Sequence, residues 1–99
     1  MHKVYSSLAV EVGLEGALLM NVFFMDAMAS DDGRFTEPVK DILEEFPYLS
    51  YRKVHRGIQS VIAHGYLRLI CRNHEGKFVY ELTQKGYRFF FENVVPAGR

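Results

Sequence analysis

The stretch from residue 14 to residue 29 is apolar nearly all round a helix, and it constrains the fold more than any other part of this sequence. A helix on the surface of a globular protein shows one apolar stripe, so this helix needs cover on two faces. A chain of 99 residues is the size of one small domain, and with 48% hydrophobic residues it can bury a real core. Its apolar residues are Leu14, Ala17, Leu18, Leu19, Met20, Val22, Phe23, Phe24, Met25, Ala27 and Met28.

Short elements flank this long helix. Before it, Ser6 or Ser7 can cap a short helix that stops at Gly13, a residue suited to a helix C-terminus. After it, residues 30–33 (SDDG) form a turn cluster. Residues 34–36 are long enough only for a stub of strand.

Two short amphipathic helices follow, separated by a proline. The first has Thr36 as its N-cap and Pro38 in its first turn, and Pro47 ends it. Ser50 caps the second and Gly65 ends it, so the pair predicts a helix-turn-helix. The apolar stripes are Val39, Ile42, Leu43 and Phe46 on the first helix, and Val54, Ile58, Val61 and Ile62 on the second.

From Tyr66 onward the apolar period changes to two, which predicts a β-hairpin. Residues 66–72 and 77–82 form its strands, and residues 73–76 (NHEG) form a turn that we expect to be mobile because it has no apolar anchor. In the first strand we expect Leu67, Leu69 and Cys71 to face the core. Thr83 then caps a last helix that carries Tyr87, Phe90 and Phe91.

Zero net charge hides a division between the two halves of the chain. Residues 1–49 hold three cations against nine carboxylates, a balance of −6, whereas residues 50–99 hold nine cations against three carboxylates, a balance of +6. No carboxylate occurs between Ser50 and Asn73. Such asymmetry favours a polyanionic partner for the basic half. The alternatives are attraction between the two halves within the fold and a merely solvated basic helix face.

Three segments carry a resemblance to a known family: "VGLEGALLMNVFF", "EEFPYLSYRKVHRGIQSVIAHGYL" and "YELTQKGYRFF". They resemble the winged-helix domains of phage and bacterial replication-type proteins and of small transcriptional regulators. The resemblance implies an α+β, mainly α, winged helix-turn-helix fold with a helical core, a two-stranded β-hairpin wing and a C-terminal helix. We expect a single domain over residues 1–93 and a flexible tail over residues 94–99.

The residues themselves favour double-stranded DNA as the partner. On a helix over residues 50–64, Arg52, Arg56 and Gln59 lie opposite the apolar stripe, and such side chains can read bases in the major groove. The hairpin, over residues 66–82, adds a second basic contact as the wing. The predicted DNA-binding residues are Ser50, Tyr51, Arg52, Lys53, Arg56, Gln59, Ser60, Arg72, His74 and Lys77.

The long apolar helix also suggests a homodimer. Its large side chains point in more directions than one domain core needs, and an exposed patch of that kind is rare on a monomer. The alternative is that the N-terminal segment and the last helix cover the extra face within one chain. The predicted interface residues are Met20, Phe23, Phe24, Met25, Met28, Phe90 and Phe91.

The sequence gives little support for other classes. Cys71 and His74 have the spacing of a partial zinc site, but such a site needs four ligands, so we expect no metal and no cofactor. No catalytic arrangement emerges, and we expect no enzyme. No apolar run approaches the roughly 18–20 residues needed to span a bilayer, and a single cysteine fits a reducing compartment. We therefore expect a cytoplasmic protein with no membrane partner, associated with the nucleoid when bound to DNA. The predicted role is transcriptional regulation; the alternative is a protein-interaction or replication-accessory module.

Overall fold

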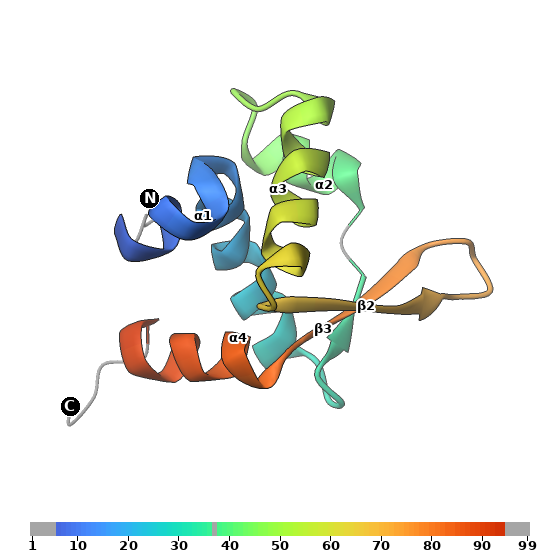
Figure 1. The fold of residues 1–99 in the computed structure, drawn as a ribbon. Helices are drawn as coiled ribbons and strands as arrows, with labels where there is room; N and C mark the ends of the chain where they lie inside the picture. Colours follow the sequence, from blue (N-terminus) through green and yellow to red (C-terminus); the bar gives the residue numbers. More distant parts are fainter. Residues whose placement is uncertain (1–5, 37, 95–99) are drawn as a thin grey trace.

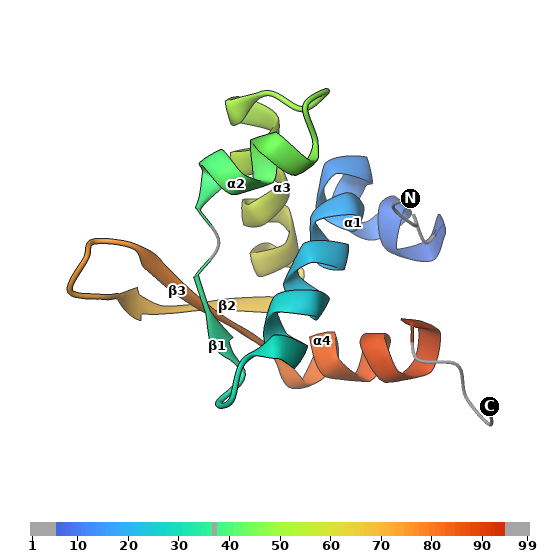
Figure 2. The same cartoon turned by 180° about the vertical axis from the view of Figure 1, so that it is seen from behind.

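The computed structural model describes residues 6–36 and 38–94 and is drawn in Figures 1 and 2. Its radius of gyration is 12.9 Å, which is the size of a compact chain of this length. The fold is mainly helical with a small antiparallel sheet, so the predicted α+β class is confirmed at that level. The elements are α1 (Ser6–Ala29), β1 (Arg34–Phe35), α2 (Val39–Glu45), α3 (Tyr51–Ala63), β2 (Leu67–Arg72), β3 (Phe78–Leu82), α4 (Gln84–Phe89) and the π-helical turn η1 (Phe90–Val94).

A glycine divides α1 into two helical segments. Gly13 has φ 86° and ψ 164°, a conformation outside the helical region that residues with a Cβ rarely adopt. The predicted helix break at this position is confirmed. The segment after the break runs through the centre of the molecule and packs against α3, the sheet and α4 (Figure 1).

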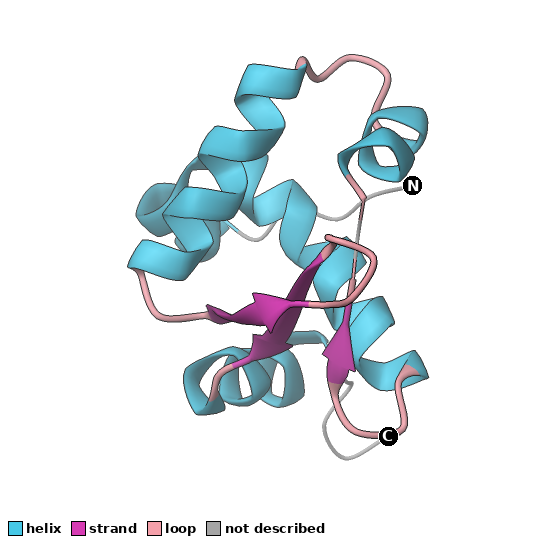
Figure 3. Cartoon of the chain, turned by 90° about the vertical axis from the view of Figure 1, so that its right-hand side faces the viewer, coloured by secondary structure: helices cyan, strands magenta, loops and turns pink. Residues whose placement is uncertain are grey.

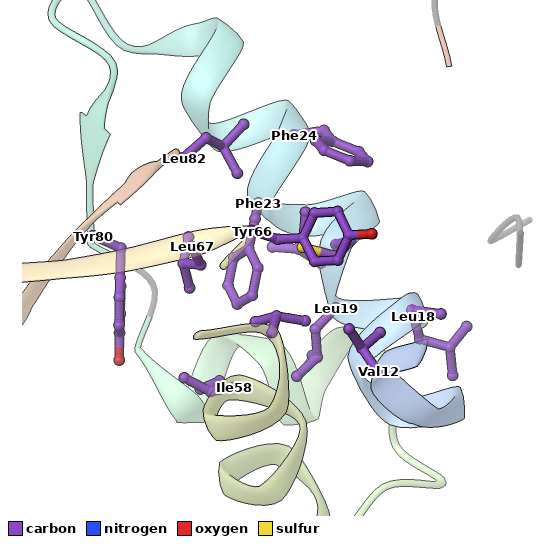
Figure 4. Packing of buried hydrophobic residues seen from close by; sticks show 14 of the residues in the cluster. Val12, Leu18, Leu19, Phe23, Phe24, Ile58, Tyr66, Leu67, Tyr80 and Leu82 are labelled. Carbon is purple, nitrogen blue, oxygen red and sulfur yellow. The ribbon is translucent and has the colours of Figure 1, made fainter. Parts of the chain in front are cut away.

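The two large faces of α1 are covered within one chain. Phe23 stacks on Phe35 of β1 at 5.9 Å between ring centroids, and Phe24 lies 4.8 Å from the ring of Phe90 in η1. Figure 4 shows the core around them, built from side chains of α1, α3, β2 and β3. Met20 is also fully buried. The prediction that Met20, Phe23, Phe24 and Phe90 form a dimer interface is therefore wrong, because the sheet and the last helix already bury them.

The capping residues in the sequence predict the start of α3 correctly and the start of α2 incorrectly. The N-cap of α2 is Pro38 and not Thr36, and no side chain caps it, although the helix ends at Glu45 before Pro47 as predicted. Ser50 caps α3 by accepting a hydrogen bond from the backbone N–H of Lys53, as predicted. The stripe Val54, Ile58 and Val61 is buried, and Gly65, with φ 84°, follows the helix end.

The sheet has three strands in the order β1-β3-β2, all antiparallel (Figure 3). The predicted strand stub pairs with β3, with Arg34 opposite Glu81 and Phe35 opposite Tyr80, so the predicted two-stranded hairpin gains a third strand. This pairing ties the end of α1 to the hairpin and closes one side of the core.

The predicted core face of β2 is correct only at Leu67. The register shifts between Leu69 and Cys71, because Ile70 is an extra residue opposite β3, and Cys71 is turned to the other face of the hairpin. Leu69 keeps the core side but is 45% exposed. The outer part of the hairpin extends beyond the helices (Figures 1 and 2). Cys71 is also exposed, so the prediction of buried Leu69 and Cys71 is wrong.

The last helix begins where predicted. The hydroxyl of Thr83 accepts a hydrogen bond from the backbone N–H of Gly86, and α4 continues into η1. Val94 belongs to η1 and not to a tail, and the rest of the predicted tail, residues 95–99, lies outside the described residues.

One helix, Ser7–Ala29, is long and apolar enough in composition to span a membrane. The prediction that no apolar run approaches this length is wrong, because a helix that contains a few polar residues can still be apolar enough on average. More than half of this segment is buried inside the fold, as in the core helix of a globular protein.

Candidate nucleic-acid interface

The basic face of α3 is open to solvent and free of carboxylate partners. Arg52, Lys53, Arg56 and Gln59 are all exposed, and none of the three cations lies within ion-pair distance of a carboxylate in the part of the chain that the structure describes. The helical period separates this face from the buried stripe through Val54. We call Arg52, Lys53, Arg56 and Gln59 the α3 basic face.

The N-terminus of α3 brings two further predicted residues to the same end of the helix. Ser50 is exposed, and its hydroxyl caps the helix through the amide of Lys53 at 3.2 Å. Tyr51 is 62% exposed, and its ring lies 4.4 Å from the imidazole of His55, one turn later. Tyr51 and His55 therefore present one aromatic stripe beside the α3 basic face.

Ser60 does not belong to this surface. Its hydroxyl donates a hydrogen bond to the backbone carbonyl of Val12 at 2.7 Å, and the group is partly buried. Val12 ends the first helical segment of α1, because the chain leaves the helical conformation at Gly13, and its carbonyl needs a partner there. The prediction that Ser60 contacts DNA is therefore wrong, since the side chain joins α3 to α1.

The hairpin carries the other predicted cations at its outer end. Arg72, His74 and Lys77 are exposed. The guanidinium of Arg72 lies 4.7 Å from the ring centroid of Phe78, and Lys77 is 3.8 Å from the carboxylate of Glu75. An ion pair this exposed contributes little, so Lys77 remains available to another anion.

Attraction between the acidic and basic halves explains only some of the cations. Lys85 of α4 lies 3.5 Å from the carboxylate of Glu11, and Arg34 of the first half lies 3.7 Å from Glu81, which also pairs with Arg68 at 2.8 Å. Among the described residues, no such pair reaches the α3 basic face. Charge pairing inside the fold is therefore no explanation for that face.

A cleft of about 170 Å³ lies between α3 and the hairpin. Its walls include Tyr51 and His55 of α3, and Phe78 and Tyr80 of β3. The Nε2 atom of His55 is buried and has no hydrogen-bond partner among the described residues. The other described lining residues are Thr36, Pro38, Val39, Gly76 and Lys77.

Sequence reasoning missed this cleft, although two signals pointed to it. Tyr51 and His55 are one helical turn apart, and Phe78 and Tyr80 alternate on one face of a strand. Each pair marks an aromatic face, but only the folded chain brings the two faces together. We call the space between them the aromatic cleft.

Metal ligands do not gather in this region. Within residues 6–36 and 38–94, no three His, Cys, Asp or Glu side chains lie close enough together to hold a metal ion.

No protein-family model matches this chain, and no curated protein or solved structure shows significant similarity to it. The geometry of α3, the hairpin and the aromatic cleft is therefore the evidence for a function.

Proposed function

We propose that this chain is a winged-helix domain that binds double-stranded DNA and acts as a transcriptional regulator. The order of helices and strands supports the assignment: two short helices joined by a turn precede a hairpin, and a short earlier strand completes the sheet. The proposal involves no catalytic step, and it assigns the protein to the cytoplasm, on the nucleoid when bound to DNA.

The observation that carries the proposal is the α3 basic face. The three cations of this face are exposed, and none of them has a carboxylate within ion-pair distance among the residues that the structure describes. A polyanion neutralises such a face and releases its own counterions, which is the main source of affinity for DNA.

In the proposed complex, α3 lies in the major groove. Arg52 and Arg56 are suited to bidentate hydrogen bonds with guanine, and Gln59 to adenine. Ser50 and Tyr51, at the start of the helix, lie where backbone N–H groups favour a phosphate. Arg72, His74 and Lys77 of the hairpin supply further contacts to the DNA backbone, which position the helix without reading sequence.

A matched pair of double variants tests this proposal. Replacement of Arg52 and Arg56 by alanine removes two cations from the α3 basic face, and each change should cost about 1–3 kcal/mol of duplex binding. Replacement of Lys40 and Arg88 by alanine removes the same charge from exposed positions on α2 and α4. Fluorescence anisotropy with a labelled duplex measures both.

The control variant should bind within a few-fold of the wild type. Equal affinities for the two double variants would contradict the proposal, because binding would then depend on net charge and not on the α3 basic face.

A homodimer remains part of the proposal, through a smaller surface than the sequence suggested. Of the predicted interface residues, Met25, Met28 and Phe91 are exposed, at 71%, 47% and 55%. A twofold copy that buried them would present two α3 helices to neighbouring half-sites. Sedimentation equilibrium at micromolar concentration tests the dimer, and a single species at the monomer mass of 11.5 kDa would exclude it.

A protein-interaction or replication-accessory module is the second candidate. It is favoured by the exposed apolar side chains of Val10 (88%) and Leu14 (55%) near the break in α1, which no described element covers. Such a module would not bind random-sequence duplex at low salt, whereas binding dominated by phosphate contacts would be strong there.

A further inference from the structure

The aromatic cleft has the size and the lining of a site for one flat ring. At about 170 Å³ it is smaller than the roughly 300–1,000 Å³ of sites for drug-sized ligands, so it holds one ring and not an extended molecule. Tyr51 and Phe78, on its two sides, are 62% and 40% exposed; the Tyr51 ring packs against His55 and the Phe78 ring against Arg72, and the remaining exposed ring surface can contact an occupant.

The charges around the cleft favour an anionic occupant. Lys77 lines it, and Arg52 and Arg56 follow Tyr51 and His55 on the adjacent face of α3. None of the described lining residues is acidic, and the nearest ion-pair partner of Lys77 is the exposed Glu75, at 3.8 Å. A ring attached to a phosphate satisfies both the aromatic walls and these cations.

The imidazole of His55 adds a further aromatic surface to the cleft, while its Nε2 atom is itself buried and lies out of an occupant's reach. A nucleotide of a DNA strand combines a base, which has a flat face and a polar edge, with a backbone phosphate. An apolar peptide side chain has neither the polar edge nor the charge.

We propose that the aromatic cleft binds one unpaired nucleobase of a DNA strand whose neighbouring duplex lies against the α3 basic face. The inference rests on the proposed function and adds to it a preference for DNA with a single-stranded end. Stacking of a base on aromatic side chains provides affinity with little dependence on sequence, and the backbone phosphate beside it reaches Lys77.

Three labelled DNAs test the inference by fluorescence anisotropy: a blunt duplex, the same duplex with a short single-stranded overhang, and that duplex with an abasic overhang. The abasic overhang has the same phosphates and no bases. The wild type should bind the base-containing overhang about tenfold more tightly than the blunt duplex, as expected for one stacked base. The abasic overhang should lose most of that gain.

Two variants separate the cleft from the rest of the surface. Phe78→Leu keeps an apolar side chain but removes an aromatic wall, and it should reduce the ratio of overhang to blunt affinity to about one. Tyr48→Leu changes an aromatic side chain that is 62% exposed and is not among the residues lining the cleft, and it should keep the wild-type ratio. A ratio is unaffected by any general loss of DNA binding.

The possible failures can be told apart. Equal affinity for blunt and overhang DNA, with blunt binding intact, would overturn the inference and leave the proposed function standing. A gain that persists on the abasic overhang would overturn it too, since phosphates alone would explain it. No binding to any of the three DNAs would overturn the inference and the proposed function together.

Discussion

At Ser60, a single hydroxyl joins two helices that are far apart in sequence. Its hydrogen bond to the Val12 carbonyl satisfies a helix end that Gly13 leaves open. Ser60→Ala should therefore lower the free energy of unfolding by about 1–3 kcal/mol, because a partly buried carbonyl loses its partner. Urea unfolding measures this change, and duplex affinity of the folded variant should stay the same.

The neighbouring residue provides the control for this prediction. Gln59 is exposed on the α3 basic face, so Gln59→Ala should leave the free energy of unfolding within about 0.5 kcal/mol and should weaken duplex binding. The account of these two residues would be wrong if Ser60→Ala weakened DNA binding more than Gln59→Ala did.

At the scale of elements, the hairpin turn is held more firmly than its sequence suggested. The side-chain oxygen of Asn73 accepts hydrogen bonds from the amides of Glu75 and Lys77 at 2.9 and 3.0 Å, and the Asn73 backbone bonds Gly76 and Lys77. The expectation that few contacts hold this turn is therefore wrong, although its side chains are largely exposed. The sequence of a short polar turn does not show which of its side chains will form hydrogen bonds with the turn's own backbone.

Removing the Asn73 side chain should loosen the turn alone. In Asn73→Ala, amide exchange at Glu75 and Lys77 should accelerate by several-fold, because each amide loses a hydrogen bond of about 0.5–1.5 kcal/mol. Asn73→Asp retains the accepting oxygens and should exchange at nearly the wild-type rate. Unchanged exchange in the alanine variant would show that the two bonds do not hold the turn.

The same scale shows what the sequence could and could not predict. The caps Ser50 and Thr83 and the break at Gly13 were predictable because capping and positive φ are properties of a few neighbouring residues. The extra residue at Ile70 was not, because a bulge depends on the register with the partner strand.

The candidate site also contains features that the sequence could predict and features that it could not. The α3 basic face was predictable from helical period alone. The role of Ser60 and the aromatic cleft were not, because both depend on which distant segments the fold brings against α3.

For the whole molecule, Tyr66 links the two ends of the chain. Burial raises the pKa of Tyr66 to about 12, and the hydrogen bond to Glu11 of α1 adds to the rise. That bond in turn lowers the pKa of Glu11, with a further contribution from the nearby Lys85. The Lys85 ammonium also lies 4.4 Å from the Tyr66 ring centroid and donates a hydrogen bond to the His64 carbonyl.

The Tyr66 shift predicts a loss of stability in alkali. The folded-state pKa of Tyr66 lies above the unfolded value of 10.0. The contribution of the neutral Tyr66 hydroxyl to the free energy of unfolding is therefore fully present below pH 10 and is lost as the pH rises toward about 12. It amounts to about 2–3 kcal/mol. Urea unfolding of Tyr66→Phe should therefore show a deficit against wild type that shrinks across this range, and a deficit independent of pH would contradict the assignment. Tyr48→Phe, at an exposed position, is the control.

The central claim is that the α3 basic face and the hairpin bind duplex DNA, and the salt dependence of duplex affinity tests it most directly. If Lys53, Arg72 and Lys77 contact phosphate while Arg52 and Arg56 reach the bases, the logarithm of the association constant should fall linearly with the logarithm of salt concentration, with a slope of about −3. Fluorescence anisotropy with a random-sequence duplex, from about 50 to 200 mM salt, gives this slope. A slope near zero, or no binding at the lowest salt, would contradict the claim.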